Sequence, residues 1–204
     1  MVSTSSAIIQ DIDDMRKSRP AILTFFYCDF REERKRDLRG LLSSLLVQLC
    51  HQSDSCCDLL SKLFSDNGNG SQHASDAALV GCLKNILKLP RRNPIYLIVD
   101  ALDECPNPPV RLTPRKEVLC FLEELINSIP NLRICVTSRP ETDIKLVLDR
   151  LTSYTIPLHD ERRQIDDING YITWFVNNDE GMQEWTREVK DHVIDVLTRK
   201  ADGM

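Results

Sequence analysis

Three acidic side chains follow directly on an apolar segment of the chain. Residues 95–99 are apolar, Asp100 comes next, and Asp103 and Glu104 stand three and four positions further on. A continuous apolar run of this length predicts a strand that is buried on both faces, as in a parallel sheet. Asp100 then lies at the carboxyl end of that strand, where open α/β sheets bind ligands. A carboxylate there can hold a magnesium ion that bridges nucleotide phosphates, and Asp103 or Glu104 can orient an attacking water.

Strands and helices alternate along most of the chain, and this alternation must position the acidic segment. β-Branched and aromatic residues predict strands at 21–28, 95–100, 132–137 and 154–158. Apolar residues at helical spacing predict helices at 7–17, 37–49, 59–64, 79–87 and 116–128, and a short one from Thr142. This order favours an α/β fold with a parallel sheet flanked by helices.

Two further helices, predicted at 165–176 and 185–200, depart from the alternation and indicate the start of a helical module. We therefore expect two parts, residues 1–160 and residues 161–204.

Composition excludes several classes of protein. The net charge of −5, with both signs interspersed, gives no support for a nucleic-acid or anionic membrane surface. No stretch approaches the ~18 apolar residues of a membrane span, and no secretory signal is present. We expect a cytoplasmic protein whose eight cysteines are reduced. Cys50, His51, Cys56 and Cys57 lie close together, but no C-x-x-C spacing occurs, which disfavours a metal centre.

Five segments together resemble the NACHT family of signal-transduction P-loop ATPases, and most closely its nephrocystin-type members, which are abundant in fungi. They are Phe26-Tyr-Cys-Asp29, the Walker B-type run from Ile95 to Cys105, Ile134-Cys-Val-Thr-Ser-Arg-Pro-Glu141, Ile156-Pro-Leu158 and Lys200-Ala-Asp-Gly-Met204. The resemblance implies a P-loop NTPase-like sheet with strand order 5-1-4-3-2, and ATP and magnesium as the family's cofactors.

The resemblance also implies roles for individual residues. Asp100 would coordinate magnesium, and Asp103 and Glu104 would polarise water. A sensor at the tip of the next strand would comprise Thr137, Ser138 and Arg139, with Arg139 reaching toward the γ-phosphate. A guanidinium suits that role because its planar fork matches phosphate oxygens.

One element of the family pattern is missing from these residues. No G-x-x-x-x-G-K-[ST] loop occurs, and the family lysine would fall at about Met1. That loop supplies backbone N–H donors and an ammonium group to the phosphates. Loss of three charge-assisted hydrogen bonds removes roughly 5–9 kcal/mol of binding. We therefore expect that this chain neither binds nor hydrolyses ATP usefully.

The first strand of the family sheet, an interior one, would be missing as well. The strand predicted at 132–137 should then expose an unpaired edge, and the strand at 154–158 should lose its neighbour. The abrupt end at Gly203-Met204, inside the family's helical region, further suggests a fragment truncated at both ends.

We therefore expect part of a NACHT-type signalling ATPase that switches between a closed state and an oligomer-forming one. One alternative is a non-catalytic interaction module that self-associates or binds a full-length paralogue through its exposed edge. Another is a non-functional truncated gene product. The residue spacings do not support a nuclease or a deaminase.

Overall fold

The computed structural model describes residues 4–68, 72–90, 93–157 and 162–201. Contacts divide the chain into two units, one ending at Leu151 and the other beginning at Thr152. Met1, Leu158 and residues 202–204, to which sequence expectations refer, lie outside the described residues.

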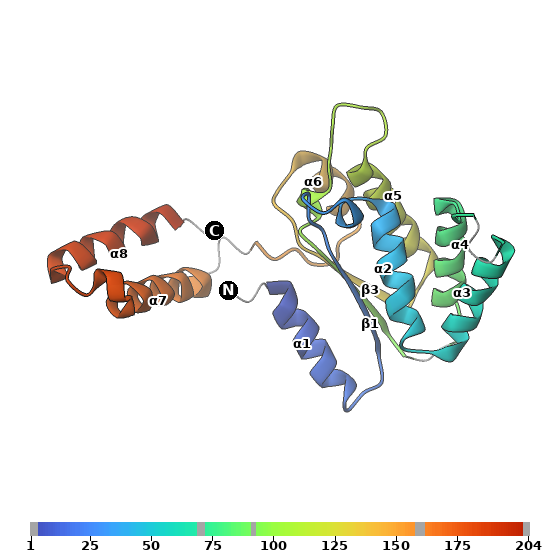
Figure 1. The fold of residues 1–204 in the computed structure, drawn as a ribbon, viewed down its shortest axis with the longest axis horizontal. Coiled ribbons are helices and arrows are strands. Elements are labelled where there is room, and N and C mark those ends of the chain that lie inside the picture. Colours follow the sequence, from blue (N-terminus) through green and yellow to red (C-terminus); the bar gives the residue numbers. More distant parts are fainter. Residues whose placement is uncertain (1–3, 69–71, 91–92, 158–161, 202–204) are drawn as a thin grey trace. The chain divides into compact units, whose positions relative to one another are not determined.

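The first unit alternates strands with helices (Figure 1). Its elements are α1 (Thr4–Arg16), β1 (Ile22–Tyr27), η1 (Glu33–Lys35), α2 (Leu38–Cys50), α3 (Asp54–Asp66), α4 (Asp76–Leu87), β2 (Ile95–Asp100), η2 (Leu102–Glu104), α5 (Pro114–Ser128), β3 (Leu132–Val136) and α6 (Thr142–Leu148).

The strands form a parallel sheet in the order β1-β2-β3. Ile22 of β1 is paired with Ile95 of β2, which is in turn paired with Leu132 of β3. The predicted parallel α/β sheet flanked by helices is confirmed, and the three strands form within two residues of their predicted ends.

The strand predicted at 154–158 is wrong, because residues 154–157 have no regular structure. A strand is stable only when a neighbour satisfies its backbone groups. No strand pairs with this segment among the described residues, and Tyr154 is 91% exposed.

The main core lies between the sheet and the helices that follow β1. Alternate side chains of a strand face opposite sides. Ile95, Leu97 and Val99 of β2 therefore join one cluster with buried leucines of α2, α4 and α5. In the sequence of α2 the apolar positions recur every three or four residues, which turns one face of the helix toward the sheet.

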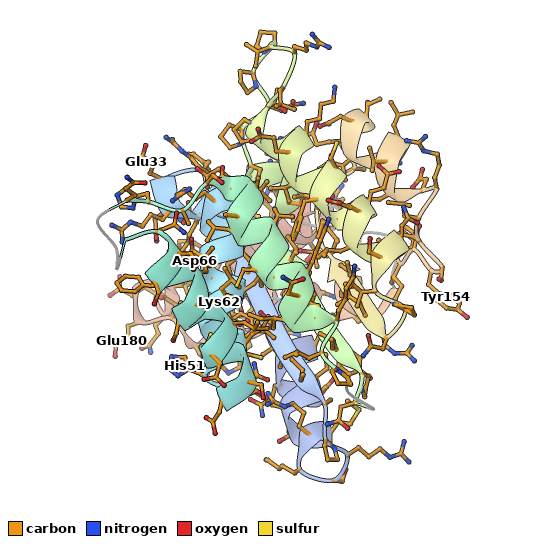
Figure 2. The ribbon with its side chains drawn as sticks, turned by 90° about the vertical axis from the view of Figure 1, so that its right-hand side faces the viewer. Glu33, His51, Lys62, Asp66, Tyr154 and Glu180 are labelled. Atoms are coloured by element: carbon orange, nitrogen blue, oxygen red, sulfur yellow. The ribbon has the colours of Figure 1, made fainter. Side chains whose placement is uncertain are left out.

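The helix α1 covers the other face of the sheet, where it contacts β1 and β2. Figure 1 shows α1 and α2 on opposite sides of the strands. Figure 2 shows α3 and α4 side by side on the outer surface of the α2 side, with Lys62 and Asp66 of α3 pointing outward. α3 is longer than the predicted helix at 59–64, because polar residues at its start weaken the apolar pattern there.

The second unit is a helical hairpin formed by α7 (Arg162–Asn178) and α8 (Arg187–Ala201), with η4 (Glu180–Met182) between them. Val176 is buried, whereas Tyr171 and Trp174 are more than half exposed. No described helix in either unit has the length and apolar character needed to cross a membrane.

Candidate functional site

The parallel register brings the ends of β2 and β3 together. The Thr137 N–H donates to the Val99 carbonyl at 2.9 Å, and the Leu102 N–H donates to the Thr137 carbonyl at 2.9 Å. The acidic segment after β2 and the polar segment after β3 are therefore joined backbone to backbone. This places the sequence-predicted residues of both segments at the carboxyl-terminal end of the sheet.

Two hydroxyl groups hold the carboxylate of Asp100. Its Oδ1 accepts a hydrogen bond from the Thr137 hydroxyl at 2.5 Å and another from the Ser5 hydroxyl. Ser5 lies in the first turn of α1 and is fully buried. Asp100 thus links the tip of β2 to the tip of β3 and to the start of α1.

A left-handed residue turns the chain sharply after Asp100. Ala101 has φ 53° and ψ 49°, a conformation that costs a non-glycine residue about 1–2 kcal/mol. Two features stabilise this conformation. The Ala101 N–H donates to the Thr137 hydroxyl oxygen at 3.0 Å. The side chain of the next residue, Leu102, is fully buried. The turn carries Asp103 and Glu104 away from the strand axis along the edge of the sheet.

Asp103 and Arg139 form the second pair of the site. The Arg139 N–H donates to Asp103 Oδ1 at 3.0 Å, and the Arg139 Nε lies 3.5 Å from Asp103 Oδ2. The Asp103 side chain is 12% exposed and the Arg139 side chain is 79% exposed, so the guanidinium reaches into solvent from a mostly enclosed carboxylate.

The remaining predicted residues take less part in this arrangement. Glu104 Oε2 accepts a long hydrogen bond, 3.4 Å, from the Phe30 N–H in the loop after β1. The Ser138 hydroxyl donates to the Arg139 carbonyl at 2.8 Å. The structure therefore brings Asp100 together with Thr137, and Asp103 together with Arg139. The Ser138 hydroxyl contacts the backbone of Arg139, and Glu104 is hydrogen-bonded to Phe30.

Arg115, in the first turn of α5, is a residue that sequence reasoning missed. It is 8% exposed, and its Nε and Nη2 donate to the carbonyls of Cys105 at 2.9 Å and of Asp103 at 2.6 Å. Its Nη1 pairs with Asp143 of α6 at 3.2 Å. Arg115 thus holds the backbone of the acidic segment through two hydrogen bonds. No motif marks it, because only the fold brings these partners together.

The thiol of Cys135 lies on β3 near Asp100. Burial, and next the negative charge of Asp100, raise the pKa of this thiol above its usual value. Cys135 is therefore a protonated neighbour of the carboxylate and not a competing anion.

The oxygen groups at the strand tips fit a magnesium ion only in part. Magnesium commonly takes one or two protein carboxylates and completes its shell with water and substrate phosphates. Asp100 provides such a carboxylate, but the described residues contain no group of three or more His, Cys, Asp or Glu placed to hold a metal. The arrangement suits an ion that arrives with its own phosphate ligands, and it includes no loop that would cradle those phosphates.

Comparison with known proteins gives two matches. Residues 3–139, which include every candidate site residue, match the family described as nephrocystin 3, N-terminal. The vegetative incompatibility protein HET-E-1 of Podospora anserina is 26% identical over 144 residues, which is 69% of this chain and 10% of that protein. The chain therefore spans about a tenth of the length of this curated relative. No solved structure matches the chain.

Proposed function

The chain belongs to the nephrocystin 3 N-terminal family, and from this premise we propose that it forms part of a NACHT-type, P-loop signalling switch. In this proposal its function is ATP-dependent signalling or self-recognition and not metabolism. The name of the fungal relative, a vegetative incompatibility protein, supports a role in distinguishing self from non-self.

The observation that carries the proposal is the contact between the two strand tips. An acid that could hold magnesium, Asp100, shares a hydrogen bond with Thr137, and a second acid, Asp103, pairs with Arg139. A site that reads nucleotide phosphates needs an acid for the metal and a cation for the phosphate at neighbouring positions. Both charged groups lie at the carboxyl-terminal ends of parallel strands, where α/β proteins bind ligands.

The pairing of Arg139 with Asp103 suggests how the site would sense a ligand. The Arg139 guanidinium is 79% exposed, so an approaching anion can reach it and compete with Asp103 for it. Arg139 would then leave Asp103, and Asp103, with Glu104, would be free to orient water. The bonds that Arg115 makes to the backbone of the same segment would keep Asp103 in place.

These residues supply only the acidic and sensor half of such a site. The 204 residues contain no G-x-x-x-x-G-K-[ST] loop, and a phosphate cradle would have to come from a segment outside them. We propose that the chain by itself binds neither ATP nor magnesium usefully and is inactive as an ATPase.

Titration of the 204-residue chain with a fluorescent ATP analogue and magnesium tests this proposal. We expect no saturation below ~100 μM. That affinity needs about 5 kcal/mol of binding energy, which the acidic and sensor residues cannot supply without a phosphate-binding loop. The variant Asp100→Ala should give the same flat titration. Saturation that Asp100→Ala abolishes would show that the acidic half binds nucleotide unaided and would contradict the proposal.

A non-catalytic interaction module is the second candidate, and a specific observation favours it. The outer edge of β3 is unpaired among the described residues, and exposed strand edges pair readily with other chains. In this alternative a second copy or a paralogue adds a strand to β3. Light scattering on the purified chain, at rising concentration, would show self-association in this alternative and a monomer in its absence.

We also propose that the protein resides in the cytoplasm. All eight cysteines are free thiols. Cysteines without disulfides are typical of proteins in reducing compartments.

A further inference from the structure

Two buried thiols lie beside the acidic segment and take no part in the site described above. Cys28 follows β1 and Cys105 follows η2, 77 residues further along the chain, and their sulfur atoms are 3.6 Å apart. Cys28 is 6% exposed and Cys105 is fully buried, and both are free thiols. We propose that Cys28 and Cys105 are a redox modification site, which closes to a disulfide when the protein meets hydrogen peroxide.

Backbone hydrogen bonds hold the two cysteines in fixed relation. The Cys28 N–H donates to the Asp100 carbonyl at 2.9 Å, and the Cys105 N–H donates to the Leu102 carbonyl at 3.1 Å. The guanidinium of Arg115 holds the Cys105 carbonyl from the other side. The thiols therefore meet because of the fold itself. A disulfide bond is about 2.05 Å long, so the sulfur atoms need to approach by only about 1.5 Å from 3.6 Å.

The surroundings make the two thiols unequal. The hydrogen bond between them, assisted by the positive charge of Arg115, lowers the pKa of Cys105 below that of an ordinary thiol. The same hydrogen bond, together with burial, raises the pKa of Cys28. Because the thiolate is the reactive form, Cys105 is the attacking group and Cys28 is the resolving group.

The reaction with peroxide balances in two steps. The Cys105 thiolate attacks one peroxide oxygen, an S–O bond forms, the O–O bond breaks, and the departing hydroxide takes up a proton to become water. The sulfur is now a sulfenic acid, oxidised by two electrons. The Cys28 sulfur then attacks it, the S–S bond forms, the S–O bond breaks, and a second water leaves with the proton of Cys28.

A bond at this place would act on the acidic segment. Cys105 directly follows Glu104, and it shares the bonds from Arg115 with Asp103. Movement of Cys105 toward β1 would therefore shift Asp103 against Arg139. This inference does not depend on nucleotide binding, because peroxide and the two thiols are its only reactants.

Peptide mapping of the oxidised 204-residue chain tests the proposal directly. The reduced protein is treated with hydrogen peroxide, its free thiols are blocked with N-ethylmaleimide in denaturant, and it is digested with trypsin. Peptides 18–31 and 93–111 contain one cysteine each, Cys28 and Cys105. A cross-link between these peptides therefore identifies the Cys28–Cys105 disulfide. We expect the two peptides to be joined in most molecules oxidised in the folded state, and in few of those oxidised in concentrated urea.

Three variants sharpen the result. Cys28→Ala and Cys105→Ala should each abolish the cross-link. Cys135→Ala, a change on β3, should retain it. The wild-type digest decides the matter even where a variant fails to fold. The proposal is overturned if both peptides keep their N-ethylmaleimide label after oxidation. It is also overturned if either is joined instead to the exposed Cys57 or Cys120.

Discussion

The two edges of the three-stranded sheet differ, because one is closed by side chains and the other is open among the described residues. At the outer edge of β1, two glutamine side chains take the place of a neighbouring strand. Gln48 accepts from the Phe25 N–H at 2.9 Å and donates to the Phe25 carbonyl at 2.7 Å. Gln52 makes the same pair of bonds with Leu23, at 3.2 and 2.7 Å. Each amide thus copies the hydrogen-bond pattern of a strand residue.

The outer edge of β3 has no such partner. The Thr137 N–H points inward to β2, so the alternating pattern of a parallel strand turns the backbone groups of Ile134 and Val136 outward. Among the described residues no strand pairs with this edge and no side chain is hydrogen-bonded to it. The contrast shows that side chains from α2 and the residues just after it close the sheet at β1, whereas the edge at β3 is free to pair with a neighbour.

The largest expected effect comes from removal of both glutamines at the β1 edge. The double variant Gln48→Leu, Gln52→Leu removes four hydrogen bonds to the backbone of β1. At about 0.5–1.5 kcal/mol each, we expect a loss of about 2–6 kcal/mol in the free energy of unfolding. Urea unfolding followed by circular dichroism measures it.

The matched control for this variant is Gln10→Leu, an equivalent change at an exposed position of α1. It should shift the unfolding free energy by less than about 0.5 kcal/mol. Unfolding of the double variant at the same urea concentration as the wild type would show that solvent satisfies the β1 edge equally well, and the contrast between the edges would disappear.

Amide hydrogen exchange compares the two edges in the unmodified protein. The N–H groups of Leu23 and Phe25 are bonded to glutamine, whereas those of Ile134 and Val136 face outward. We expect the first pair to exchange at least about 10-fold more slowly in NMR measurements, because exchange requires an open hydrogen bond.

Thr137 serves as the control within the same segment, since its N–H is bonded to Val99 and should be protected. Equal protection of Ile134, Val136 and Thr137 would mean that something covers the β3 edge in solution. Protection that rises with protein concentration would identify that cover as a second copy of the chain.

The smallest expected effect is an alkaline loss of stability that arises in α2, the helix that carries Gln48. Burial, and next the hydrogen bond with Cys57, raise the pKa of Cys50, between the two glutamines in sequence, to about 12 from an ordinary 9.0. Below pH 9 the thiol is protonated in both the folded and unfolded states, and its contribution to stability is complete. Above that pH the unfolded chain loses the proton first, so stability falls as the pH rises toward about 12.

Urea unfolding of the wild type and of Cys50→Ala, below and above pH 9, checks this sign. The wild type should lose more stability than the variant over the alkaline range. A parallel decline of the two proteins would show that Cys50 does not contribute.

Much of the fold could be predicted from local patterns, and the exceptions share one cause. The strands at β1, β2 and β3 follow from apolar and β-branched runs, which fit a buried sheet in any arrangement. Residues 154–157 carry similar residues yet form no strand, because a strand also needs a partner that the local sequence does not supply. For the same reason the sequence did not reveal the role of Gln48 and Gln52. Their amides close the β1 edge only after the fold packs this part of the chain against the strand.

The sequence by itself determined which groups could do chemistry here: the spacing of Asp100, Asp103 and Glu104 after one strand, and of Arg139 after the next. Only the tertiary structure decided how these groups pair, with Asp103 held by Arg139, Asp100 by hydroxyls from two other segments, and the acidic turn by Arg115. The physical reason is that side-chain type and local periodicity are encoded over a few residues. Hydrogen bonds between strand tips depend instead on register and crossing, which the whole packed core sets.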